Sequence, residues 1–457
     1  MAVFSLKCVI RSGSHTKKDI QLKINAMKTK KFFTLIAVVI LSVTVAETAY
    51  AGNSDGKKKV NPQDLITIRG KIVDNQTKSP LIFASVTVKE SNVGIVTNID
   101  GEFTLKVSPS ATDLEVSYLG YKNLTIPIST LKENGGKNTI EMEAAPIPIK
   151  EIIVKPVDPV AVVEKAISKI EVNYESVPNL MTAFYRETIR KNRSYVSIGE
   201  AVVEIFKAPY VSDIRFDGTR IYKGRKSSDV EKMDTVLFKL QGGPVTVLQL
   251  DIVKNTESIL TREAMEYYDY MISGVIEVDG KPHYIIDFKQ KPSVEHPLFM
   301  GSFFINMETF AITEAEFGFN LEDKEAAAAI FIRKKPLGMK VYPEIASYRT
   351  KYRAQDGKLH FIYSRAEVRF KVDWSKKLFH TYYTTMSEIA VTDRTDQEVI
   401  KFAKEDKIKY TDVFSEKVSD FADREYWGDY NIIEPDQSIE TAIKRLSRKL
   451  KFSDREE

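Results

Sequence analysis

Two long stretches of the sequence alternate apolar and polar residues with a period of two, and this constrains the fold more than any other feature. In residues 66–144 the alternating runs are short, and turn signals such as Asn98-Ile99-Asp100-Gly101 separate them. From Tyr267 to Ala390 the runs are longer, with a hairpin signal at Asp279-Gly280. Successive side chains of a strand point to opposite faces of a sheet, so the pattern predicts half-buried antiparallel strands. We expect a mainly β protein, with an N-terminal β-sandwich of the seven-stranded type followed by a larger antiparallel sheet.

The composition of the chain changes along its length and suggests a division into domains. The expected order is an upstream extension plus signal peptide (1–51, with the signal from 27), a flexible leader (52–65), the β-sandwich (66–145), a proline-rich linker (146–158), an antiparallel β-rich domain with an N-terminal helix (159–434) and a C-terminal amphipathic helix (435–457). Asp158 as N-cap and Pro159 at the first helical position predict where the helix of the large domain begins. Its predicted apolar stripe consists of Val163, Ala166, Ile167 and Ile170.

A secretion signal begins about thirty residues into the chain. The basic segment Met27-Lys28-Thr29-Lys30-Lys31 precedes an apolar run from Phe32 to Ala46, and Ala49-Tyr50-Ala51 closes it as a small-x-small cleavage site. The apolar run is short for a membrane span. We expect export, cleavage after Ala51 through recognition of Ala49 and Ala51, and a location in the periplasm or at the outer membrane. Residues 1–26 are expected to be an over-long gene start or an extension, and the alternative is that the run stays uncleaved as an anchor.

The charge and the cysteine content exclude several classes of function. Residues 1–51 carry a net charge of +6 and the whole chain +4, so the part after the predicted cleavage site is close to −2. This balance gives no electrostatic basis for nucleic-acid binding. The only cysteine is Cys8, upstream of the signal, so we expect no disulfide, thiol nucleophile, cysteine metal site or lipid-modified cysteine in the exported part.

The motifs of the first domain resemble a known module. They are Gly70-Lys71-Ile72-Val73-Asp74, Pro80-Leu81, Ala84-Ser85-Val86-Thr87-Val88, Gly94, Thr97-Asn98-Ile99-Asp100-Gly101-Glu102-Phe103-Thr104-Leu105 and Leu114-Glu115-Val116-Ser117-Tyr118-Leu119-Gly120-Tyr121. Together they look like a carboxypeptidase regulatory-like domain, the transthyretin-like sandwich of cell-envelope proteins of the Bacteroidetes type. The resemblance implies a non-catalytic accessory or docking module. It implies no zinc peptidase, because His283, His296, His360 and His380 lie outside any H-x-x-E or H-E-x-x-H pattern.

This module also stands before TonB-dependent receptors, and Glu151-Ile152-Ile153-Val154 resembles their coupling box. A receptor-related component is therefore one alternative, although too few residues follow for a plug and a 22-stranded barrel. We interpret Ala144 to Pro159 as a stiff linker instead.

The large domain is similar, in pattern, to the curved half-barrels of lipoprotein-carrier proteins, over about residues 185–390. That resemblance implies an apolar pocket enclosed by an antiparallel sheet and flanking helices. Alternating strand residues would then line the pocket, and the candidates for ligand contact are Phe303, Ile305, Phe317 and Phe319. A second prediction concerns Phe361 and Tyr363, which are expected to share a face and to be followed by a bulge before Val368.

Few residues suggest chemistry. Glu314 and Glu316 share one face of a predicted strand, as a glycosidase pair does, but alternation on a half-solvated sheet explains them more simply. His283 stands beside a hairpin turn with only Asp279 or Asp287 to face it. The tyrosine clusters at Tyr267-Tyr268-Asp269-Tyr270 and Tyr382-Tyr383 offer rings for stacking on sugars, but strands collect aromatic residues anyway, so packing within the sheet is the favoured interpretation. We predict no catalytic residue, no cofactor and no metal.

The chain closes with a predicted amphipathic helix from Pro435-Asp436. Its apolar stripe consists of Ile439, Ile443, Leu446 and Leu450, and its other face of Lys444, Arg445, Arg448, Lys449 and Lys451. Basic residues there suit the helix dipole, and the alternative is peripheral contact with an anionic membrane.

Together these patterns predict a non-enzymatic exported envelope protein, with a β-sandwich docking module and a β-rich domain that binds a lipid, a glycan or an envelope protein. The alternative is an envelope hydrolase for glycans or peptides, with its site in the large domain. An apolar lumen would favour the binding protein, and a polar cleft with convergent ionisable groups would favour the hydrolase.

Overall fold

The computed structural model of the chain describes residues 8–9, 65–133, 136–145, 157–228, 240–255, 259–335, 337–375, 379–420 and 426–444. The predicted signal, with Ala49 and Ala51, the leader and most of the linker lie outside these residues. So do the coupling-box resemblance at 151–154 and the C-terminal residues from 445 onward.

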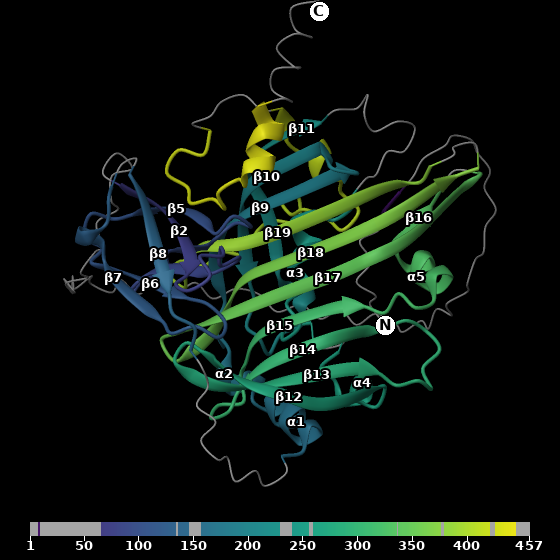
Figure 1. Cartoon of the computed structure of the whole chain (residues 1–457), viewed down its shortest axis with the longest axis horizontal. Coiled ribbons are helices and arrows are strands. Elements are labelled where there is room, and N and C mark those ends of the chain that lie inside the picture. Colours follow the sequence, from purple (N-terminus) through teal and green to yellow (C-terminus); the bar gives the residue numbers. More distant parts are fainter. Residues whose placement is uncertain are drawn as a thin grey trace, which may run out of the picture.

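The N-terminal domain is a sandwich of a three-stranded and a four-stranded sheet, at the left of Figure 1. The first sheet has the order β5-β2-β8 and the second β4-β3-β6-β7. Its strands are β2 (Ile66–Asp74), β3 (Ser85–Val88), β4 (Gly94–Val96), β5 (Glu102–Val107), β6 (Asp113–Ser117), β7 (Leu124–Pro127) and β8 (Lys137–Met142). The alternating residues Ile68 and Ile72 of β2 and Phe103 and Leu105 of β5 are at most 1% exposed, so the predicted inner face is the core.

The large domain is built on one open sheet of eleven strands in the order β12-β13-β14-β15-β17-β18-β19-β9-β10-β11-β20. Neighbours are antiparallel except β11 and β20. The strands are β9 (Asn179–Lys191), β10 (Ser194–Lys207), β11 (Gly218–Ser228), β12 (Tyr268–Val278), β13 (Lys281–Gln290), β14 (Phe299–Asn306), β15 (Ile312–Phe319), β17 (Met339–Gln355), β18 (Lys358–Trp374), β19 (Thr381–Thr395) and β20 (Ser419–Asp420). A separate short pair joins β1 (Cys8–Val9) to β16 (Ile332–Lys334). The prediction of a mainly β protein with a sandwich before a larger antiparallel sheet is confirmed.

Short helices flank the large sheet. They are α1 (Pro159–Ser168), α2 (Ile170–Asn173), α3 (Pro244–Leu248), α4 (Arg262–Met265) and α5 (Lys324–Phe331), with 3₁₀ turns at Ile128–Thr130, Ile214–Phe216 and Phe414–Glu416. Helix α1 begins as predicted, because the Asp158 carboxylate accepts a hydrogen bond from the Val160 N–H at 3.0 Å. Residues 437–444 are helical as well. Within the described ranges, none of the helices has the length and apolarity needed to cross a membrane.

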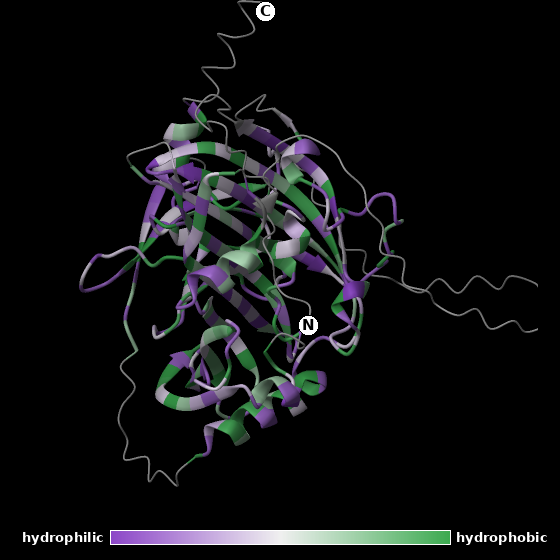
Figure 2. Cartoon of the chain, turned by 90° about the vertical axis from the view of Figure 1, so that its right-hand side faces the viewer, coloured by the Kyte–Doolittle hydropathy of each residue, from purple (hydrophilic) through white to green (hydrophobic). Residues whose placement is uncertain are grey.

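The two faces of the large sheet are covered by different parts of the chain. We call the face that packs on α1 and residues 240–255 the inner face, and the face toward the N-terminal domain and residues 426–444 the outer face. Hydrophobic and hydrophilic bands alternate along the strands in Figure 2, as expected for side chains that point alternately to two faces. Both faces of the central strands are buried, so the sheet is the shared core of the molecule.

Two central strands were not predicted, β9 because both of its faces are buried and β17 because its alternation changes phase after Pro343. Strand β9 is buried over most of its length on both faces, with Arg186, Glu187 and Thr188 among its buried residues. Strand β17 contains Pro343 in its first half and an irregularity in pairing immediately after it. Polar residues on a two-sided buried strand break the apolar pattern on which sequence-based prediction depends.

The prediction that Phe361 and Tyr363 share a face is wrong. Tyr352 pairs with Phe361 and Lys351 with Tyr363, so a bulge at Ile362 lies between them. Phe361 therefore belongs to the inner core and Tyr363 to the outer one. The predicted bulge exists, but it comes before Tyr363 and not after it.

Two glycines of the sheet differ sharply in the space around them, which gives a test of the pairing. A Cβ at Gly301 would overlap the Glu316 carbonyl oxygen and lie 2.5 Å from Phe317 Cα on β15. At Gly274 the nearest atom would be Ile285 Cδ1 at 3.5 Å, an ordinary contact. We predict that Gly301→Ala lowers the free energy of unfolding by about 2 kcal/mol or more, whereas the control Gly274→Ala changes it by less than about 1 kcal/mol. Urea unfolding measures both, and equal effects would contradict the β14–β15 register.

Candidate functional site

The four predicted ligand-contacting residues lie together on the inner face. Phe303 and Ile305 of β14 and Phe317 and Phe319 of β15 are at most 8% exposed and belong to one apolar core. The Phe303 ring stacks on Phe288 with the ring centroids 4.3 Å apart. The residues are thus brought together as expected, packed against aromatic neighbours, and their contact with a ligand stays a prediction.

A segment of the chain itself covers the inner face. Its residues Leu240, Val247, Leu248, Leu250, Ile252 and Val253 are all at most 3% exposed. The Thr350 hydroxyl of β17 donates to the Leu250 carbonyl at 2.6 Å, and the Ser364 hydroxyl of β18 donates to the Val247 carbonyl at 2.9 Å. We call residues 240–255 the inner segment. It satisfies polar groups of the sheet as well as burying apolar ones.

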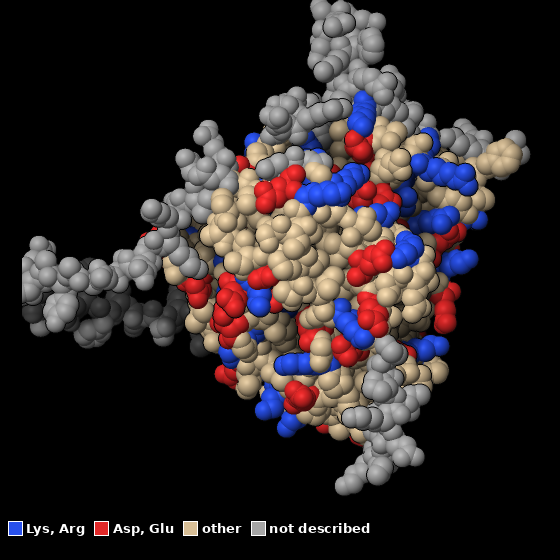
Figure 3. All heavy atoms as spheres, turned by 60° about the vertical axis from the view of Figure 1, so that its left-hand side comes forward, with Lys and Arg blue, Asp and Glu red and all other residues tan. Residues whose placement is uncertain are grey.

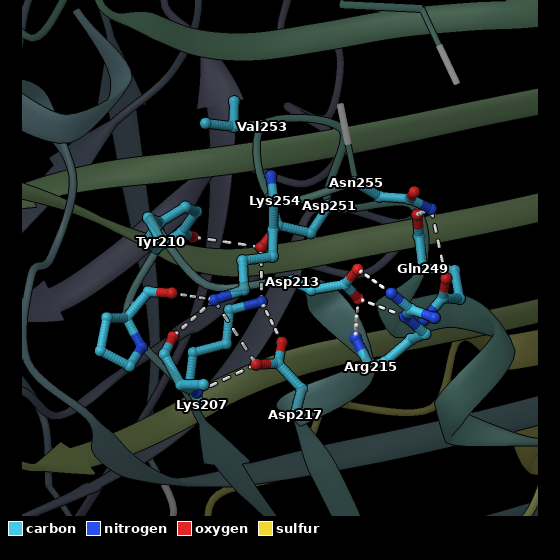
Figure 4. Close-up of polar contacts among 12 residues, drawn as sticks. Lys207, Tyr210, Asp213, Arg215, Asp217, Gln249, Asp251, Val253, Lys254 and Asn255 are labelled. Carbon is cyan, nitrogen blue, oxygen red and sulfur yellow. Dashed lines mark hydrogen bonds and ion pairs between the residues drawn. The ribbon is translucent and has the colours of Figure 1, made fainter. Parts of the chain in front are cut away.

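A buried ion cluster ties the inner segment to the sheet, and Figure 4 shows its members converging. The Lys207 ammonium, at the end of β10, lies 2.8 Å from Asp217 Oδ2 and 2.6 Å from Asp251 Oδ2. Asp251 belongs to the inner segment and also accepts hydrogen bonds from the hydroxyls of Tyr352 and Tyr210, at 2.8 and 3.2 Å. The side chains of Lys207, Asp217 and Asp251 are at most 3% exposed. We call Lys207, Asp217, Asp251 and Lys254 the inner ion cluster.

The protonation of the two lysines differs because their surroundings differ. Burial lowers the pKa of Lys207, but the Asp217 and Asp251 carboxylates more than offset this, so the net pKa is raised. Burial dominates for Lys254 and lowers its pKa to about 8. The Lys254 ammonium donates to the carbonyls of Ala208, at 2.8 Å, and Pro209. Both ammonium groups are enclosed and fully paired. They therefore hold the inner segment against the end of β10.

A second buried ion cluster lies on the outer face, in the middle of the sheet. Arg186 of β9 is 1% exposed and lies between two carboxylates, 2.9 Å from Glu200 Oε1 on β10 and 3.3 Å from Glu388 Oε1 on β19. Glu200 also binds Arg225 at 2.9 Å, and Glu388 binds Arg365 at 3.2 Å. We call these five residues the outer ion cluster. Burial lowers the pKa of Arg186, but Glu200 and Glu388 more than offset it, so the guanidinium stays charged.

The C-terminal segment and the N-terminal domain cover the outer ion cluster. Arg186 donates to the Ile433 carbonyl at 2.8 Å, and the Phe184 ring meets Trp427 edge to face. From the N-terminal domain, Phe83 stacks on Tyr363 with the ring centroids 5.4 Å apart. Because both covering elements contact the same part of the sheet, the two domains share one buried interface.

The predicted chemical candidates are engaged in this packing. Glu314, on the outer face, is 4% exposed and lies 3.4 Å from the Lys351 ammonium and 3.6 Å from Arg349. Burial raises the pKa of Glu314. Glu316 forms its ion pair with Arg349 as well, so the two carboxylates face basic residues of β17. His283 is buried, its Nδ1 lies 2.9 Å from the Lys281 carbonyl oxygen, and burial lowers its pKa.

In the part of the chain that the structure describes, no three His, Cys, Asp or Glu side chains lie together in a group that could hold a metal ion. Glu187, on the inner face, accepts a hydrogen bond from the Tyr185 hydroxyl at 2.8 Å, and burial raises its pKa to about 7. At 5% exposure this carboxyl is enclosed in the core. Sequence reasoning missed Glu187 because β9 itself was not predicted.

A solvent-open cleft lies where three parts of the chain meet, with a volume of about 510 Å³. The N-terminal domain supplies the Ile99-Asp100 turn, the β9–β10 turn supplies Arg193 to Tyr195, and the C-terminal helix supplies the third side. We call it the junction cleft, and its lining residues are Ile99, Asp100, Arg193, Ser194, Tyr195, Asp436, Gln437, Ser438, Thr441 and Ala442. Sequence analysis did not find it, because the three parts are far apart in the chain.

Contacts inside the wall of the junction cleft fix its shape. The Asp100 carboxylate of the N-terminal domain accepts a hydrogen bond from the Gln437 N–H at 3.0 Å. Asp436 accepts one from the Ile439 N–H at 2.8 Å and so caps the C-terminal helix. Ile439 packs on Tyr195 and Ile198 of β10. The described part of the predicted C-terminal stripe thus docks on the sheet, and Leu446, Leu450 and the basic residues from Arg445 onward lie outside the described residues.

Comparison with known families identifies the first domain. Residues 68–154 match the model of the CarboxypepD_reg-like domain, which confirms the resemblance seen in the sequence motifs. This domain is the non-catalytic accessory type. No curated protein matches the chain.

Two solved structures align with about half of the chain. One is a DUF1329 family protein from Desulfovibrio piger, 14% identical, covering 53% of this chain and 95% of its own, with a TM-score of 0.23. The other is a proposed outer membrane lipoprotein-sorting protein domain from Vibrio parahaemolyticus, 8% identical, covering 55% of this chain and 97% of its own, also with a TM-score of 0.23. The second is of the class that the half-barrel pattern resembles. At these scores no property of this chain follows from either.

The outer ion cluster predicts a large difference between two arginines of β9. Arg186→Ala leaves Glu200 and Glu388 buried without their shared cation, so we expect the free energy of unfolding to fall by about 3–5 kcal/mol. Arg190→Ala is the matched control, because Arg190 is 36% exposed and 3.8 Å from Glu367. Its expected cost is at most about 1 kcal/mol. Thermal or urea unfolding tests both, and a mild effect at Arg186 would show that the cluster is not a determinant of stability.

The inner ion cluster predicts a pH dependence of stability. The pKa of Lys254 is about 8 in the folded protein and 10.5 when exposed, so between these values the unfolded chain binds more protons. The Lys254 contribution therefore rises with pH across this window, by at most about 1.4 kcal/mol per pH unit, and is lost as the pH falls to 8. The measurement is the difference in unfolding free energy between the wild type and Lys254→Met from pH 8 to pH 10. A difference that stays flat would contradict the lowered pKa.

Proposed function

We propose that the protein is a non-catalytic binding protein of the cell envelope, and that it holds a glycan in the junction cleft. Two observations support the absence of a catalytic role. The identified domain is of the non-catalytic type, and the strongest candidates for acid–base chemistry in the described chain are enclosed in ion pairs or hydrogen bonds. A hydrolase needs ionisable groups that converge on a solvent-open site.

The junction cleft is the single observation that carries the binding role. Its volume of about 510 Å³ lies within the range of ligand sites. Its lining includes the hydroxyls of Ser194, Tyr195, Ser438 and Thr441, with the amide of Gln437. Hydroxyl and amide groups both donate and accept hydrogen bonds, which matches the hydroxyl-rich surface of a sugar. Ile99, which is 40% exposed, adds apolar contact of the kind that sugar rings make.

The surface charge of the N-terminal domain fits a neutral ligand or partner better than a polyanion. In Figure 3, where this side of the molecule comes forward, acidic and basic side chains are interspersed around a broad uncharged area. Mixed charge gives no single-sign field that would steer nucleic acid to this face. The signal-like segment before Ala51 supports a location in the periplasm or at the outer membrane.

A matched pair of substitutions tests the junction cleft. Thr441→Lys places a long side chain on the exposed helix face that lines the cleft, and Thr125→Lys adds the same side chain at an exposed position of β7. With soluble peptidoglycan fragments and lipopolysaccharide core oligosaccharides as probes, we expect the wild type and Thr125→Lys to bind alike. We expect Thr441→Lys to bind at least about tenfold more weakly, because its side chain fills the site. Isothermal titration calorimetry measures the affinities.

Two results would contradict the proposal. One is equal binding by both variants, which would place the ligand outside the junction cleft. The other is turnover of a peptide, ester or glycoside by the purified chain, which would favour the hydrolase.

A further inference from the structure

The start of β17, the end of β18 and the start of β19 lie together at one end of the large sheet, at the upper right of Figure 1 and away from the N-terminal domain. Met339 pairs with Trp374 there, and the Ser375 N–H donates to the Gly338 carbonyl at 3.0 Å. On the other side Val372 pairs with Thr381. Leu337 and Gly338, just before β17, and Phe379 and His380, just before β19, therefore lie at the same end of the sheet. We call this end the strand tip.

The strand tip presents two large apolar side chains to solvent. Leu337, just before β17, is 102% exposed, and Phe379, just before β19, is 82% exposed. Among the described residues these are the two most exposed large apolar side chains. A soluble surface tolerates scattered apolar residues, but two bulky exposed ones at the same end of a sheet are unfavourable in water, and burial in a lipid interface would remove that cost.

Basic residues lie near these two residues in the sequence and in the strand pairing. Lys335 and Lys340 are exposed, and neither forms an ion pair with another described residue. Lys371 of β18 is half-buried, and Asp373 is the acidic residue across from Lys340. The strand tip thus combines an apolar point with a surplus of positive charge, which complements the phosphates of an anionic bilayer.

We propose that the strand tip inserts Leu337 and Phe379 into the headgroup region of an anionic phospholipid bilayer while Lys335 and Lys340 bind lipid phosphates. The shape favours lipid over a protein partner. A stable protein interface buries roughly 800 Å² on each partner, whereas a few apolar side chains suffice for interfacial anchoring, and the strand tip offers two. Aromatic residues such as Phe379, and Trp374 at the end of β18, suit the interface between headgroups and acyl chains.

Vesicle binding by the full exported chain tests this inference. The probes are vesicles of phosphatidylcholine alone and of phosphatidylcholine mixed with phosphatidylglycerol. We expect the wild type to sediment with the mixed vesicles, and the fluorescence of Trp374 to shift to the blue. The variant W374F identifies that signal, because the other tryptophan, Trp427, is buried at the domain interface.

Substitutions separate the strand tip from the rest of the surface. The double variant L337D/F379D should lose at least about tenfold in vesicle partitioning, since it replaces the inserted side chains by charges. The matched control is I400D, because Ile400 is 76% exposed and follows β19 at its other end. K335E/K340E should weaken binding to mixed vesicles and remove its dependence on phosphatidylglycerol.

The vesicle-binding results of the variants show whether the strand tip inserts into the bilayer. Loss of binding in L337D/F379D with retention in I400D supports insertion of the strand tip. The inference is overturned if the wild type binds neither vesicle, or if L337D/F379D binds as the wild type does, which would assign membrane contact to another surface such as the C-terminal helix.

Discussion

One buried cation joins the large sheet to the C-terminal segment on which the N-terminal domain rests. Arg186 lies in the centre of the outer face, between Glu200 and Glu388, and its remaining donor binds the Ile433 carbonyl of the C-terminal segment. A charge this deeply buried is tolerable only when it is fully paired, so strands β10 and β19 and the C-terminal segment must all be in place around it. The segment then contacts the first domain, where the backbone of Lys106 and the Asn431 side chain exchange two hydrogen bonds.

The two domains consequently form one body with several separate contacts. Besides the stack of Phe83 on Tyr363, the Gly120 N–H donates to the Glu277 carbonyl, and Asn92 donates to the Arg394 carbonyl at the opposite side of the interface. The CarboxypepD_reg-like domain thus packs against the large sheet at several separate points. These contacts shape the junction cleft and lie far from the strand tip, so the proposed ligand and the proposed membrane contact would be at separate places.

The sequence predicted those parts of the structure in which local pattern and burial agree. The sandwich strands, the Asp279-Gly280 turn (φ of 50° and 69°) and the Asp158 cap followed from alternation, turn chemistry and capping. The motifs also sufficed to identify the first domain. Strand β9 escaped prediction because both of its faces are buried, and its outer face places the polar Arg186 and Thr188 beside Phe184. The ion clusters and the junction cleft escaped because each joins residues that lie far apart in the chain, and no single-sequence pattern encodes such contacts.

A distance measurement between the two domains tests the account most directly. The chain has no cysteine after Cys8, so the exported protein accepts spin labels at two introduced cysteines alone. Thr125→Cys on β7 and Lys289→Cys on β13 are exposed positions in the two domains. A single narrow distance distribution by double electron–electron resonance is the result that a fixed interface around Arg186 predicts. A broad or bimodal distribution would show that the first domain moves on its linker, and the shared interface and the junction cleft would then be contradicted.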